Sequence, residues 1–192
     1  MRIVSFIIMA LVSFALGAFF LYHRYDRMME NRRIEAMNDR ISGANRVVER
    51  ITTLDSNSRD CTDWLVGLTT GTFQQPSLKP RVALQFAQSC DTQMNSSADK
   101  SIDTIQRLEN SSEAEGALAF FTAARDLTAA YRGQSQDFGR ATELLTETHE
   151  AGASLSRHQG AVVDLVNRRL PAINDGLEEF DTTRRAFITP NG

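Results

Sequence analysis

Residues 3–22, IVSFIIMALVSFALGAFFLY, form an apolar run that contains no charged residue and no proline. Twenty helical residues rise roughly 30 Å, which matches the hydrocarbon core of a bilayer. A helix in a soluble core usually confines its apolar residues to one stripe, whereas this run is apolar on every side. The sequence therefore predicts a transmembrane anchor over residues 1–22 and membrane association through residues 3–22.

A cleaved signal peptide is the main alternative for this run. Arg2 supplies a basic start, and Ala15–Ala18 offers small residues for cleavage. The apolar region of a signal peptide is usually about 7–15 residues long, which is shorter than this run. Cleavage after Ala18 would also leave Phe19 and Phe20 exposed at the new N-terminus. We therefore expect the anchor to be retained.

Two features give opposite predictions for the side of the membrane that holds the body. Arg24, Arg27, Arg32 and Arg33 follow the run and only Arg2 precedes it, which favours a cytoplasmic body by the positive-inside rule. The short basic start before an apolar run and the two cysteines favour export. We expect a single-pass protein of a bacterial inner membrane with a periplasmic body. A cytoplasmic body is the alternative.

Residues 23–56 are predicted to continue the anchor as a juxtamembrane stalk helix. The segment contains no proline, and its only glycine is Gly43. Its apolar residues are spaced alternately by three and four, which places them along one side of a helix. We call these residues the stalk seam and expect it to pack on another helix of the same chain, with a homodimer contact as the alternative. The stalk seam comprises Ile34, Met37, Ile41, Ala44, Val48 and Ile51.

The body, residues 57–189, is predicted to be an antiparallel helical bundle, and residues 190–192 form a tail. The chain has only four prolines, and its Ala, Leu, Glu and Arg content favours helices. No segment combines strand alternation with hairpin turn residues. The predicted fold is therefore all-α, with an N-terminal transmembrane helix that continues into a stalk helix and an antiparallel helical bundle.

Several helix boundaries can be predicted from turn and capping residues. Ser112 and Glu115 form a capping box that predicts a helix start. A long helix is expected from Gln136 to Arg169, before Pro171 interrupts it. The remaining breaks are expected at Asp55–Ser58, Gly71–Pro80, Asn95–Ala98 and Gly133.

Cys61 and Cys90 are predicted to form a disulfide. The loop expected at Gly71–Pro80 would turn the chain back, so that the helices carrying the two cysteines run antiparallel. Cys61 lies three residues before Trp64, and Cys90 lies four after Phe86. Each thiol therefore shares a helix face with a large apolar ring. Two unpaired, buried thiols are the alternative.

No pattern in the sequence predicts catalysis, a metal site or a cofactor. The zinc-protease, di-iron, CxxC and glycine-rich phosphate motifs are all missing. His149 and His158 are nine positions apart and so do not share a helix face at a spacing of four. The net charge of −3 gives no basic surface of the kind that nucleic acids require.

These features favour a membrane-anchored, non-enzymatic accessory or scaffold subunit. Such a subunit would present a helical surface to a protein partner. The alternative is an extracytoplasmic sensor domain that binds a small molecule or an ion between helices. An enzyme is the least expected class, because no nucleophile and base pair can be named.

Overall fold

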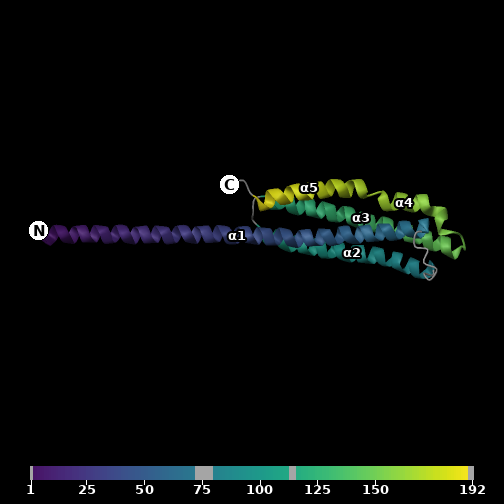
Figure 1. Cartoon of the computed structure of the whole chain (residues 1–192), viewed down its shortest axis with the longest axis horizontal. Coiled ribbons are helices and arrows are strands. Elements are labelled where there is room, and N and C mark those ends of the chain that lie inside the picture. Colours follow the sequence, from purple (N-terminus) through teal and green to yellow (C-terminus); the bar gives the residue numbers. More distant parts are fainter. Residues whose placement is uncertain (1, 72–79, 113–115, 190–192) are drawn as a thin grey trace. The chain divides into compact units, whose positions relative to one another are not determined.

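The structure, a computed structural model, describes residues 2–71, 80–112 and 116–189, with side chains for 19–71, 84–112 and 116–189. This part of the chain is almost entirely helical and contains no strand, so the predicted all-α class is confirmed. The helices are α1 (Arg2–Thr70), α2 (Pro80–Asn110), α3 (Ala117–Glu150), the 3-10 helix η1 (Leu155–His158), α4 (Gln159–Asn167) and α5 (Leu170–Ile188) (Figure 1).

The chain divides into two compact units, residues 1–42 and residues 43–192. The first unit consists of the N-terminal part of α1. Residues 3–18 of the predicted anchor fall outside the residues whose side chains are described. Within the described residues, no helix is long and apolar enough to cross a membrane.

The second unit is a bundle in which successive long helices run antiparallel. From Asn57 to Cys61 along α1, the contacts on α2 move backwards from Ser97 to Cys90. Helix α3 contacts α2, α4 and α5. The broken pair α4 and α5 therefore occupies the fourth position of the bundle, and the predicted antiparallel bundle is confirmed.

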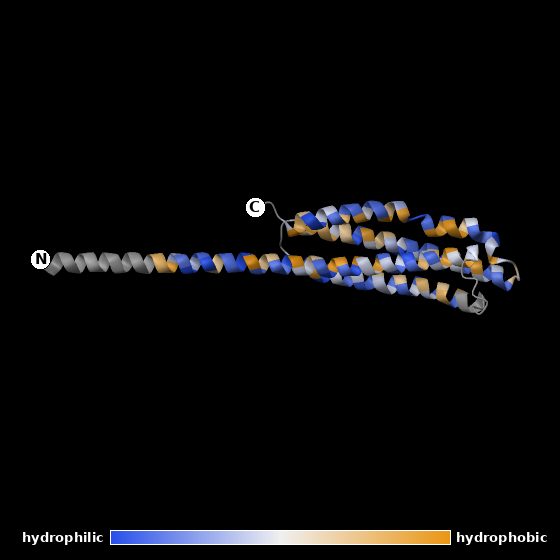
Figure 2. Cartoon of the chain, viewed as in Figure 1, coloured by the Kyte–Doolittle hydropathy of each residue, from blue (hydrophilic) through white to orange (hydrophobic). Residues whose placement is uncertain are grey.

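Apolar residues at helical spacing form the core of this bundle. Figure 2 shows that hydrophobic and hydrophilic residues alternate along its helices. Near the start of α3, the ring of Phe120 stacks on Phe187 and Phe180 of α5, with centroids 5.0 and 5.5 Å apart. On α1 the buried residues recur at steps of three and four. The series comprises Ala44, Val47, Ile51, Leu54, Ser58, Cys61, Leu65 and Thr69.

Two predicted breaks are wrong, because α1 continues through Asp55–Ser58 and α2 continues through Asn95–Ala98. Short polar side chains break helices when they bond to their own backbone. Here the Asn57 amide instead donates to the hydroxyl of Ser97 at 3.0 Å, across the two helices. Because these side chains bond to each other across the two helices, they do not compete for the backbone hydrogen bonds of their own helix, and both helices stay intact.

Helix α3 also starts and ends differently from the prediction. It begins at Ala117 after Gly116, whose φ is 78°, and residues 113–115 of the capping box lie outside the described residues. It continues through Gly133, so the predicted end at that glycine is wrong. A β-carbon on Gly133 would lie 3.3 Å from the Arg169 guanidinium, so the glycine gives this side chain room against α3.

The predicted helix from Gln136 to Arg169 is interrupted after Glu150. Gly152 adopts a left-handed conformation with φ 70°. The amides of Gly152 and Ala153 donate to the carbonyls of His149 and Thr148. This pattern is a Schellman motif, which ends a helix at a left-handed residue. The predicted break at Pro171 is confirmed, because this proline lies in the first turn of α5.

Candidate functional site

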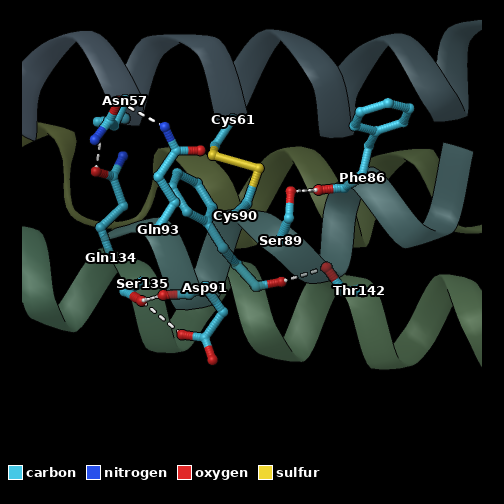
Figure 3. Close-up of a disulfide and its surroundings, with 12 residues drawn as sticks. Asn57, Cys61, Phe86, Ser89, Cys90, Asp91, Gln93, Gln134, Ser135 and Thr142 are labelled. Carbon is cyan, nitrogen blue, oxygen red and sulfur yellow. Dashed lines mark hydrogen bonds between the residues drawn. A yellow bond between two sulfur atoms is a disulfide. The ribbon is translucent and has the colours of Figure 1, made fainter. Parts of the chain in front are cut away.

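The best defined feature of the bundle is a disulfide between α1 and α2. Cys61 and Cys90 lie at disulfide distance, with their α-carbons 5.7 Å apart (Figure 3). Both residues are buried in the core. The predicted pairing is confirmed, although Cys61 belongs to the long helix α1, which continues through the break predicted at Asp55–Ser58.

Two aromatic rings lie beside this disulfide. The Trp64 and Phe86 rings meet edge to face, with centroids 5.3 Å apart. Phe86 is 53% exposed, so one face of the pair meets solvent. The rings lie one turn from the cysteines on their respective helices, as the sequence spacing predicts. They extend the contact between α1 and α2 beyond the covalent bond.

A set of polar bonds crosses the bundle one turn away from the disulfide. The Ser58 hydroxyl donates to the Gln134 side chain at 2.6 Å, and the Gln134 amide donates to the carbonyl of Val166 at 3.4 Å. Gln134 is fully buried, and both ends of its side chain are therefore bonded. Figure 3 also shows Ser135 of α3, whose hydroxyl donates to Asp91 of α2 at 2.6 Å. These bonds fix the register of four helices.

Tyr131 extends this polar set towards α1. Its hydroxyl donates to the Asp55 carboxylate at 3.0 Å, and Asp55 also pairs with Arg59 at 2.8 Å. Burial raises the pKa of the Tyr131 phenol well above its usual value of 10.0, and the charge of Asp55 raises it further. The phenol therefore remains a hydrogen-bond donor to Asp55 across the physiological range.

A buried carboxylate ties α3 to the junction of α4 and α5. The Asp137 side chain is 1% exposed, and its oxygens accept from Arg168 at 3.2 Å and Arg169 at 3.1 Å. Arg140 approaches the same carboxylate at 3.6 Å. The guanidinium groups are half-exposed, so they keep much of their hydration while compensating the buried charge. This cluster positions α4 and α5 on α3.

The structure divides the stalk seam between the two units. Ile34 and Met37 belong to the first unit and are 52% and 47% exposed. Ala44 and Ile51 are buried in the bundle, with Val48 partly buried beside them. Ile41, at the end of the first unit, is half-buried. The C-terminal half of the stalk seam therefore packs within the chain, as expected, and the N-terminal half is uncovered.

The predicted stalk seam includes Val48, which is only partly buried. Its neighbour Val47 is the valine that is fully buried in the core. The spacing of three and four does not decide between these two valines, but from Ile51 onward it leads to Leu54 and Leu65, which the predicted stalk seam left out. Sequence reasoning also missed Gln134 and Asp137, because no local pattern marks a polar residue whose partners lie on other helices.

The described residues contain no group of three or more histidine, cysteine or acidic side chains that could hold a metal ion. Comparison with known proteins finds no matching family model, no similar curated protein and no similar solved structure. The site must therefore be interpreted from the residues themselves.

Proposed function

We propose that this protein is a membrane-anchored, non-enzymatic accessory or scaffold subunit, with a single transmembrane helix at residues 3–22 and a periplasmic body in a bacterium. The observation that carries this proposal is the band of uncovered apolar side chains in residues 19–42. Phe19, Phe20, Leu21 and Tyr22 are 68–71% exposed. Contiguous apolar surface of this kind is rare on soluble monomers and marks contact with a membrane or another protein.

The first half of the band supports the anchor. Phe19 to Tyr22 complete the apolar run of residues 3–22, and aromatic rings are enriched where a membrane helix enters the headgroup region. Tyr25 lies one turn further and is 59% exposed. Arg24 and Arg27 follow at once, where their charges can meet lipid phosphates.

The second half of the band supports a protein partner. Ile34, Met37 and Ile41 follow one another at steps of three and four, which places them on one face of the helix in the first unit. A partner helix laid on Ile34, Met37 and Ile41 would cover apolar side chains that the described residues of the first unit leave exposed or half-exposed. Buried polar side chains such as Ser58, Gln134 and Asp137 bond to groups on other helices of the body, which suits a structural role.

The anchor is tested by N-terminal sequencing of the protein extracted from membranes. We expect an N-terminus at Met1 or Arg2 and resistance to alkaline extraction. A mature end near Phe19 would refute the anchor. Periplasmic placement is tested with a membrane-impermeant alkylating reagent on a variant in which Ser154, exposed in the body, is replaced by cysteine. Labelling in intact spheroplasts is expected, and labelling only after lysis would place the body in the cytoplasm.

The partner surface is tested with a photo-crosslinking residue at Met37 and, as the matched control, at Asp39. Both positions are exposed, but they lie on opposite sides of the helix. We expect one discrete adduct from position 37 and none from position 39, and Met37→Asp should abolish co-purification of the crosslinked protein. An adduct with a second copy of the chain would identify a homodimer. Equal or no crosslinking at both positions would refute the proposed surface.

A further inference from the structure

A second surface feature lies in the bundle itself, where a cavity of about 450 Å³ opens between α1 and α2. This volume is within the range of about 300–1,000 Å³ that is typical of small-molecule sites. Three arginines line the cavity, Arg46 and Arg50 from α1 and Arg107 from α2. Its charged lining also includes Glu49, so the local charge is close to +2.

The arrangement of the arginines is not explained by pairing within the protein. Arg46 and Arg50 are one turn apart on the same face of α1, and like charges at this spacing repel each other. Among the side chains that the structure describes, no carboxylate lies within salt-bridge distance of Arg46, Arg50 or Arg107. Most arginines at other positions of the bundle do pair, as Arg59, Arg125 and Arg132 illustrate.

The hydroxyl groups that line the cavity already donate to backbone carbonyls, so the guanidinium groups are the donors available to a ligand. The hydroxyls of Thr104 and Ser111 donate to the carbonyls of Lys100 and Leu108, at 2.8 and 2.9 Å. Arg107 uses only its Nε, which donates to the carbonyl of Asp103, and so its two terminal nitrogens are free to bind. Guanidinium groups bind phosphate and carboxylate oxygens in pairs of parallel hydrogen bonds.

We infer that this cavity binds a small oxyanion with at least two negative charges, of the phosphate or diphosphate class. The anion would bridge Arg46 and Arg50 on one helix to Arg107 on the other and relieve their repulsion. The inference goes beyond the proposed scaffold and does not depend on it, because the cavity is built entirely within residues 43–192. The phosphate could belong to a soluble compound or to a lipid headgroup, since both present the same oxygens.

The test uses the full chain in a non-ionic detergent and titrates it with pyrophosphate by calorimetry, with sodium chloride added to hold the ionic strength constant. We expect one binding event per chain. Arg46→Gln, Arg50→Gln and Arg107→Gln should each weaken binding at least about tenfold, the loss of one charge-assisted contact. Arg157→Gln makes the same charge change at an exposed position outside the cavity and should bind as the wild type does.

Melting curves identify any variant that fails to fold. Arg50 is half-buried, whereas Arg46 and Arg107 are exposed, so the latter two variants keep the test decisive if Arg50→Gln is unstable. Absence of pyrophosphate binding by the wild type would overturn the inference. Equal binding by the wild type and by the folded variants would overturn it as well.

A second arm distinguishes the two sources of phosphate. The full chain is reconstituted in nanodiscs of phosphatidylcholine, with or without phosphatidylglycerol, and the pyrophosphate titration is repeated. Weaker apparent affinity in the presence of phosphatidylglycerol would show that a lipid headgroup competes for the arginines. Unchanged affinity would assign the site to a soluble anion. Either result supports the site, provided that the arginine variants bind pyrophosphate more weakly than the wild type.

Discussion

Reduction of the Cys61–Cys90 disulfide should destabilise the bundle by a predictable amount. The bond joins residues 29 positions apart in the sequence. In the chain-entropy model, a closed loop of this length removes about 12 cal/mol/K from the unfolded chain, which corresponds to about 3.6 kcal/mol at 25 °C. For a domain of this size, 1 kcal/mol shifts the melting temperature by roughly 2–4 °C. We therefore expect reduction to lower the melting temperature by roughly 7–14 °C.

The assay is thermal unfolding followed by circular dichroism, with and without a phosphine reductant. Reduction of the wild type removes the bond and keeps every heavy atom of the two side chains. The double variant Cys61→Ala, Cys90→Ala should melt near the reduced wild type and should not respond to the reductant. Free thiols in freshly denatured, unreduced protein, or a melting temperature that reductant leaves unchanged, would refute the assigned bond and weaken the case for an exported body.

Three further predictions concern the division of the seam, the end of α3 and the buried phenol. In urea unfolding, Ile51→Ala should lower the free energy of unfolding by about 2–5 kcal/mol, whereas Ile34→Ala, at an exposed position, should change it by less than about 0.5 kcal/mol. Equal effects would contradict the division of the stalk seam into a buried and an exposed half. Gly152→Ala should cost about 1 kcal/mol in the same assay because of its left-handed backbone, while Gly160→Ala, on open helical surface, should gain about 0.5–1 kcal/mol. The pKa of Tyr131 is higher in the folded than in the unfolded chain, so its contribution to stability is complete below pH 10.0 and is lost as the pH rises above that value. In a pH series of urea unfolding, the free energy of unfolding should therefore fall less above pH 10.0 in Tyr131→Phe than in the wild type. Identical curves would refute the raised pKa of the phenol.

The sequence predicts those features of the bundle that depend on local spacing. The helical class follows from apolar periodicity, and the disulfide follows from two cysteines that each lie within a turn of an aromatic ring. Pro171 acts locally, through its missing amide, and its break is confirmed. In each case the residues that decide the structure are within a few positions of one another.

Features that depend on distant partners could not be predicted in this way. Ser58 looked like part of a helix break, but its hydroxyl bonds to Gln134, which lies 76 positions away. The choice between Val47 and Val48 depends on the direction from which α2 and α3 approach, because both valines fit the spacing of three and four. The cavity arginines are a similar case, since Arg107 meets Arg46 and Arg50 only once α2 has folded back along α1.

The single covalent crosslink lies between α1 and α2, and this placement makes the bundle unequal in its local stability. Helix α5 is attached to α3 through residues such as Ile173, Phe180 and Phe187, and these contacts can separate without breaking a bond. Native proteins open in cooperative segments, and the least constrained segment opens first. Backbone amides of α5 should therefore exchange with deuterium before those that flank Cys61 and Cys90. Each opening would expose the ring of Phe120 to water, so the packing of α5 governs how long this aromatic surface stays buried.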